Sequence, residues 1–296
     1  VIPVPSATLG GGYISLETLR LVSAIRKLGV KFVLITGARC STFFNRINSK
    51  TLPEIDYGVN EGGGRVWDAS LKHDDTYTDR WAKECGPWRD QLEMDSAEKQ
   101  GPLWDVYRLL AKEDALGPGT GKAKMDGASF VTSFMVTVGG NVHPTLGMAD
   151  VTEEEKVLRK MTEEELKPKY NVEMCINLGK AQFAPVGVNK RTALEYVAKK
   201  VGVSLAAEPA PADGTPKKVA CALFDDENDL GFASACSLGF APSVAHPSVI
   251  PALEELGPRF QRSPIQGLLG TEYALTQLHD MAVRAGNSAA AATSSQ

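Results

Sequence analysis

The chain has 296 residues, enough for two compact domains or for one domain with a large insertion. Its hydrophobic content of 43% and charged content of 23% are ordinary for a soluble globular protein. With 32 basic and 36 acidic residues, the net charge of −4 offers no basic surface for nucleic acid. No apolar stretch reaches the roughly 20 residues that a membrane span needs.

The five cysteines and four histidines are scattered along the chain. Their spacing matches no metal-binding motif, which disfavours a zinc site. The cysteine contexts suit buried free thiols in a reducing compartment, such as the cytosol or an organelle matrix like that of a plastid. The sequence starts at Val1, so no targeting segment can be read from it.

The first part of the chain predicts a helix, a strand and a hairpin. Ser15 is a suitable N-cap for an amphipathic helix that ends at Gly29. A strand over Val30–Ile35 then runs into a Gly-containing turn, after which another helix can begin. Two short strands on either side of three glycines within 57–67 are typical of a hairpin.

The character of the sequence changes between about 69 and 180. Polar helical stretches, chiefly 81–113, and isolated strands replace the earlier alternation. Thr152 and Thr162 each precede three glutamates, which predicts two capped helix starts. This block therefore reads as an α+β module inserted into the first domain.

Strand–helix alternation resumes after the module. A helix is expected over Lys190–Gly202, a doubly buried strand over Val219–Phe224, a helix over Leu230–Ser237 and a last short strand. Residues 205–216 are rich in Ala and Pro and are typical of a surface loop or a tether. The low-complexity end, 286–296, is expected to be a flexible tail.

The run Asp225-Asp226-Glu227-Asn228-Asp229 directly follows the buried strand. Acids there lie at the carboxyl edge of the sheet, where open α/β folds keep their sites. Two carboxylates about 4 Å apart repel by roughly 4 kcal/mol at an effective dielectric of about 20. Mg²⁺ removes that repulsion, so Asp225 and Asp229 are candidate metal ligands. A solvated acidic turn is the alternative.

Thr36, after the first strand, and Lys190, at a helix start, complete the candidate site. A hydroxyl, an ammonium group and a carboxylate-held metal at one sheet edge are what phosphoryl transfer needs, because its transition state spreads negative charge over oxygens. The sequence thus predicts that Thr36, Lys190, Asp225 and Asp229 gather around one pocket.

Four segments in this order resemble motifs of the haloacid dehalogenase (HAD) superfamily, most closely its Cof-like sugar-phosphate phosphatases. The segments are 32–37 (FVLITG), 60–63 (NEGG), 187–190 (GVNK) and 224–229 (FDDEND). The resemblance implies that Thr36 and Lys190 are catalytic and that Asp225 and Asp229 hold Mg²⁺. It also implies that Gly37, Arg39 and Asn228 join Thr36 and Lys190 in binding substrate.

The chain departs from the family pattern in several places. Ala38 shifts the usual Arg by one position, Asn60 and Glu61 are in swapped order, and Phe224 replaces a glycine. More seriously, the sequence contains no Asp-x-Asp-Gly-Thr motif, whose first Asp is the family's nucleophile. Either the motif precedes Val1, or it is degenerate and its two acids are replaced by Val4 and Ser6. Pro3 and Pro5 make a poor central strand, which favours the first explanation.

The predicted fold is α/β: a Rossmann-like HAD core with a parallel sheet and an inserted α+β cap. The core comprises 1–68 and 181–285, and the cap comprises 69–180. The resemblance implies a Mg²⁺-dependent hydrolase of a small phosphate monoester, with a phosphorylated metabolite as partner. A catalytically inactive subunit of a protein complex and a phosphometabolite sensor are the alternatives that the missing nucleophile motif suggests.

Overall fold

The protein is described by a computed structural model, which covers residues 14–49, 52–138, 151–177, 179–205 and 218–293. Val4 and Ser6, the two positions weighed for the nucleophile motif, and most of the predicted loop at 205–216 lie outside these ranges. None of the helices in the described ranges combines the length and apolar character that a bilayer span requires.

Two three-stranded sheets form the core. In the first, β1 pairs in parallel with β2 and β2 pairs antiparallel with β3, whereas the second, ordered β10-β9-β8, is entirely parallel. The strands are β1 (Val33–Ile35), β2 (Tyr57–Asn60), β3 (Arg65–Asp68), β8 (Cys221–Leu223), β9 (Leu238–Ala241) and β10 (Phe260–Arg262).

We infer that the two sheets form one layer, because residues in or next to β1 and β8 share packing partners on both faces. Ile35 and Phe224 lie in one hydrophobic cluster with the helices α8 (Lys190–Val201) and α9 (Glu227–Ala235). On the opposite face, Phe32 and Leu223 pack with the helices α1 and α11. Within the described ranges, β1 pairs only with β2 and β8 only with β9.

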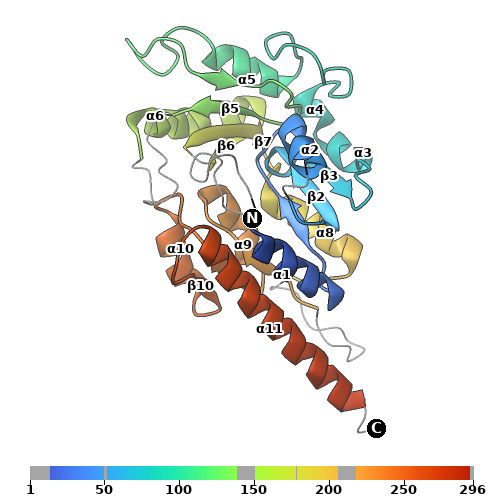
Figure 1. Cartoon of the computed structure of the whole chain (residues 1–296). Coiled ribbons are helices and arrows are strands. Elements are labelled where there is room, and N and C mark those ends of the chain that lie inside the picture. Colours follow the sequence, from blue (N-terminus) through green and yellow to red (C-terminus); the bar gives the residue numbers. More distant parts are fainter. Residues whose placement is uncertain (1–13, 50–51, 139–150, 178, 206–217, 294–296) are drawn as a thin grey trace.

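Helices cover both faces of this layer (Figure 1). α1 (Leu16–Lys27) begins after Ser15, whose side chain accepts a hydrogen bond from Thr18 N, so the predicted cap is confirmed. α1 packs along the long helix α11 (Leu268–Thr293), and α2 (Cys40–Asn48) and α10 (Val249–Leu256) complete the core. Helical backbone therefore extends to Thr293, into the alanine-rich stretch predicted as a flexible tail; alanine is the best helix former.

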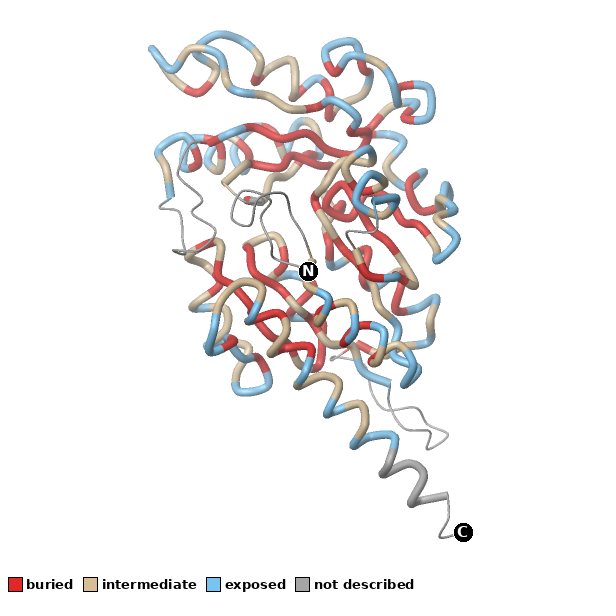
Figure 2. Tube along the Cα trace, in the orientation of Figure 1, coloured by how far each residue is buried: buried red, intermediate tan, exposed pale blue. Residues whose placement is uncertain are grey.

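The inserted cap has its own sheet and its own hydrophobic core. Its antiparallel strands are ordered β4-β5-β7-β6. Trp104, Phe134 and Phe183 are fully buried in it, and the rings of Phe134 and Phe183 stack 5.1 Å apart. Figure 2 shows buried backbone along the strands of both the cap and the core. The cap elements are β4 (Met125–Asp126), β5 (Phe134–Thr137), β6 (Val172–Asn177), β7 (Lys180–Pro185), α5 (Pro102–Leu110), α6 (Glu153–Met161), the π-helical turn η3 (Thr162–Leu166) and α7 (Lys167–Tyr170).

The structure corrects several helix predictions. Between 81 and 113 only α4 (Ala82–Cys85) and α5 are α-helical. Gly86, at a positive φ of 68°, ends α4, and Gly101, at a positive φ of 109°, directly precedes α5. Thr162 caps nothing: it lies inside a continuous helix, and its hydroxyl donates to Leu158 O at 2.7 Å. The short elements that remain are η1 (Glu61–Gly63), α3 (Asp75–Thr78) and η2 (Asp79–Trp81).

Candidate active site at the carboxyl edge of the core sheet

The acidic run after β8 forms the start of α9, three residues before the predicted helix start. Asp226 is the N-cap and accepts a hydrogen bond from Glu227 N at 2.8 Å. Asp229 completes a capping box, since its Oδ2 accepts from Asp226 N at 3.4 Å and also from Asp225 N at 3.1 Å. The backbone thereby holds the carboxylates at the positive end of the helix. The run is thus built into the fold and is not a solvated turn.

Lys190 is the first residue of α8, and it reaches across to α9. Its Nζ lies 2.5 Å from Asp229 Oδ1 and 2.8 Å from Asn228 Oδ1. The side chains of Lys190 and Asp229 are only 6% and 1% exposed. Asn189 fixes the start of α8 by accepting a hydrogen bond from Thr192 N at 2.9 Å. The structure therefore brings together Lys190, Asn228 and Asp229, which lie about 40 positions apart in the sequence.

Burial and charge set the protonation of this group. Burial, together with repulsion from Asp229 and Asp226, raises the pKa of Asp225 well above its ordinary value. Burial also acts to raise the pKa of Asp229, but the adjacent Lys190 ammonium outweighs it and lowers that pKa. Burial would lower the pKa of Lys190, yet Asp229 and the neighbouring acids raise it. Lys190 and Asp229 thus form a charged pair, and Asp225 is left as an uncompensated buried carboxyl group.

These residues fit a divalent cation beside an anion. Asp225 is a buried carboxyl group whose ionisation a cation would stabilise. Both Asp229 oxygens already accept hydrogen bonds, so Asp225 offers the more available oxygens. Asn228 Nδ2 is buried and has no hydrogen-bond partner in the described ranges; as an amide donor, it matches an anionic oxygen. Phe224 packs against Phe260 in the core, at a ring separation of 6.4 Å.

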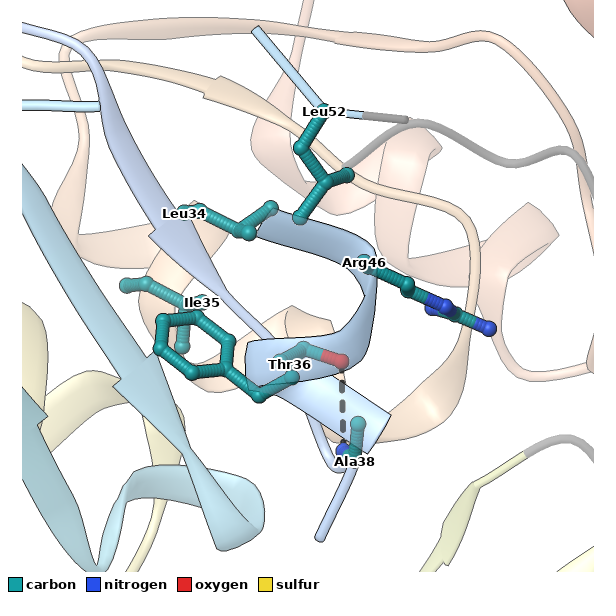
Figure 3. Close-up of a pocket in the computed structure, with 7 residues that line it drawn as sticks. Leu34, Ile35, Thr36, Ala38, Arg46 and Leu52 are labelled. Atoms are coloured by element: carbon teal, nitrogen blue, oxygen red, sulfur yellow. Dashed lines mark hydrogen bonds between the residues drawn. The ribbon is translucent and has the colours of Figure 1, made fainter. Parts of the chain in front are cut away.

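Thr36 directly follows β1. Its hydroxyl accepts from Ala38 N at 3.2 Å, as Figure 3 shows, and its carbonyl accepts from Gly62 N at 3.0 Å. Gly63, at φ 118°, packs so closely on the start of α8 that a Cβ there would lie 2.2 Å from Asn189 O. The η1 turn therefore lies between Thr36 and Lys190. The hollow drawn in Figure 3 is lined by Leu34, Ile35, Thr36, Ala38, Phe43, Arg46 and Leu52, on the side of β1 that faces α2.

Arg39 turns toward the cap. Its guanidinium pairs with Asp126, donates to Ala128 O at 3.1 Å and lies over the ring of Phe130. Gly37 is buried in the turn that leads to α2. Arg39 thus contacts the cap segment 126–130, and the substrate-binding roles of Arg39 and Gly37 stay predictions.

Glu61 has a structural role that could not be predicted from the sequence. It is fully buried, at a positive φ of 54°. Its Oε2 accepts from Val131 N at 2.8 Å, Thr132 N at 2.7 Å and Thr132 Oγ1 at 2.8 Å. Glu61 therefore joins the core to the cap. No local pattern signals this, because the partners lie about 70 positions away.

Neither a protein-family model nor a curated protein sequence matches this chain. Solved structures do match it. The sucrose-phosphatase of Synechocystis sp. PCC6803, solved with sucrose and phosphate, aligns with a TM-score of 0.58 and 16% identity over 89% of this chain and 90% of that one. The C-terminal domain of C. albicans trehalose-6-phosphate phosphatase aligns with a TM-score of 0.51 and 13% identity, covering 95% and 87% of the two chains. The HAD subclass IIB sugar phosphatase BT4131 aligns with a TM-score of 0.50 and 11% identity over 94% and 95%.

At these identities the matches report the fold. They confirm the predicted α/β fold with parallel strands, and they show that this fold resembles that of solved HAD sugar phosphatases.

Proposed function

We propose that this protein is a Mg²⁺-dependent hydrolase of small phosphate monoesters, with a sugar phosphate as its class of substrate. The observation that carries the proposal is the buried contact of Lys190 with Asp229 and Asn228, beside Asp225, at the carboxyl edge of the sheet. Sugar phosphatases among the structures of the same fold support the substrate class.

Each residue of the site has a role that follows from its donors and charge. Lys190 Nζ would neutralise phosphoryl oxygens while Asp229 keeps it charged and in place. Asn228 Nδ2 would donate to one of these oxygens, and Thr36 would donate its O–H, since its oxygen already accepts from Ala38 N. Asp225, assisted by Asp229, would hold Mg²⁺, which when bound would neutralise charge on the transferring phosphoryl group.

We propose that the cap, whose sheet extends through β7 to Pro185, closes the site and selects the substrate. Closure over a polar site excludes water and orients the bound ester. Arg39 and Glu61 support this role, because both connect the edge of the core sheet to the cap segment 126–132.

A second candidate function is binding without turnover, as a phosphometabolite sensor or an inactive subunit of a protein complex. The observation that favours it is the lack of an Asp-x-Asp-Gly-Thr segment in the sequence. Without the first aspartate of that motif there is no carboxylate to form the family's aspartyl-phosphate.

Phosphate release from a panel of sugar phosphates, with and without Mg²⁺, tests the proposal. We expect release that requires Mg²⁺ and is lost in Lys190→Met, while Lys199→Met, an exposed change on the same helix, keeps it. If no phosphate is released but Mg²⁺ and a sugar phosphate raise the melting temperature, the result favours the sensor over the hydrolase. If neither phosphate release nor a thermal shift is observed, the inactive structural subunit is the function that remains.

A further inference from the structure

A second group of polar side chains lies between the cap and the core. Glu155 comes from α6 of the cap, Glu227 is the first residue of α9, and His246 follows β9. One nitrogen or oxygen atom from each of the three lies within 4.8 Å of the other two. Glu155 and His246 are 4% and 6% exposed. The group thus offers one imidazole and two carboxylates in a largely buried place.

His246 supplies the observation that points to a ligand. Its Nε2 is buried, has no hydrogen-bond partner in the described ranges and lies 3.7 Å from Glu155 Oε1. Two ligands at about 2.1 Å from a tetrahedral Zn²⁺ lie about 3.4 Å apart, so this spacing is close to that of a metal site. Buried ring nitrogens normally have partners, and one without a partner calls for an explanation.

The other ring nitrogen is already oriented. His246 Nδ1 lies 2.7 Å from Ser248 Oγ, which can accept an Nδ1–H and leave the Nε2 lone pair available. Ser248 N also lies 3.2 Å from Nδ1, so a metal at Nε2 would select the tautomer in which Oγ is the partner.

Arg159 competes for the same oxygens. Its Nη2 lies 2.7 Å from Glu155 Oε1 and 2.5 Å from Glu227 Oε2. One guanidinium neutralises only one of the two carboxylates, whereas a divalent ion would balance both. The Arg159 side chain is 38% exposed, so it has room to turn into solvent.

We propose that Glu155, Glu227 and His246 form a binding site for a divalent transition-metal ion, with Zn²⁺ as the best match, and that Arg159 occupies the site in its absence. Imidazole with carboxylates suits Zn²⁺, whereas Mg²⁺ prefers oxygen ligands alone. The site is separate from the proposed Mg²⁺ ligands and does not rest on phosphatase activity. Because Glu155 belongs to the cap and the other two to the core, a bound ion fastens one to the other. In the sequence, the scattered histidines disfavoured a zinc site. The fold brings two glutamates beside one histidine, and together they provide three ligands.

Calorimetric titration of the whole chain with Zn²⁺, in excess Mg²⁺, tests this site. We expect one Zn²⁺ per chain that is lost or weakened at least tenfold in His246→Ala and in Glu155→Gln. Arg159→Gln should bind Zn²⁺ several-fold more tightly, because it removes the competitor. Glu153→Gln, an exposed change on the same helix, should bind as the unaltered protein does. Equal binding by His246→Ala, or no binding by either the unaltered protein or Arg159→Gln, overturns the proposal.

Co²⁺ provides a second measurement that needs no variant of the histidine. Bound at an imidazole–carboxylate site, it should give visible absorption bands that added Zn²⁺ abolishes. Zn²⁺ should also slow hydrogen exchange in α6, since the ion joins that helix to the core. A Co²⁺ titration without such bands contradicts the site even if His246→Ala fails to fold.

Discussion

Two acidic runs that look alike in the sequence behave differently in the structure. Asp225-Asp226-Glu227-Asn228-Asp229 lies at the edge of the core sheet, and Glu163-Glu164-Glu165 lies in η3 of the cap. In the core, the Lys190–Asp229 pair is 6% and 1% exposed, whereas in the cap the Lys167–Glu163 pair is 41% and 66% exposed. Water solvates the cap charges and screens them, but the core charges depend on one another. Burial, not composition, therefore separates a chemical site from a solvated surface.

The largest effect is expected for Lys190→Met, which leaves Asp229 buried without its cation. Loss of one partner of a buried ion pair typically costs about 3–5 kcal/mol of unfolding free energy. Denaturant unfolding measures it, with Lys199→Met on the same helix as control. A loss of unfolding free energy below about 1 kcal/mol would mean that water reaches Asp229. The contrast between the buried charges of the core and the exposed charges of the cap would then be wrong.

Glu61→Gln should destabilise the joint between core and cap by about 2–3 kcal/mol. The amide oxygen can still accept the three hydrogen bonds of Oε2, but it carries no charge, and bonds to a charged acceptor contribute about 1.5–3 kcal/mol. The amide NH2 group would then replace Oε1, which lies 3.6 Å from Arg65 Nη1, and put a donor beside a cation. We also expect faster proteolysis within the cap. Glu163→Gln, the same change at an exposed site, is the control.

Asp225→Asn should stabilise the metal-free protein at pH 7, because it removes a buried carboxyl group that the neighbouring acids repel. Burial and neighbouring acids raise the folded-state pKa of Asp225, so the folded state binds more protons than the unfolded one. Stability of the unaltered protein therefore falls as pH rises from the ordinary aspartate value toward the raised one. The advantage of the variant should vanish near pH 4. Unfolding at both pH values checks this, and destabilisation at pH 7 would contradict the charge assignment.

Lys167→Met should change the unfolding free energy by no more than about 0.5 kcal/mol, because its partner Glu163 is exposed and separated by one helical turn. The small loss should disappear in high salt, where surface charges are screened. A loss as large as that of Lys190→Met would show that exposure does not distinguish the two acidic runs.

Much of this molecule is determined locally. Ser15 caps α1 as its side-chain chemistry predicts. The apolar run before Asp225 does contain a strand, β8, but the strand is shorter than predicted and only its middle residue, Ala222, is buried. The order of the motif-like segments, through their resemblance to the HAD family, led to the predicted α/β fold, which solved structures share. Thr162 shows the limit of such signals. A threonine before three glutamates is a good cap only where a helix begins, and here the preceding helix continues through it.

Other features were decided by tertiary structure alone. Three contacts join residues about 70 to 90 positions apart. Glu61 accepts a hydrogen bond from Val131 N, Arg39 pairs with Asp126, and Glu155 lies close to His246. The charged residues can be identified from the sequence, but their burial and their partners cannot, because both depend on how the cap packs on the core. Coulomb energy varies with distance and with exclusion of water, and the folded chain sets both.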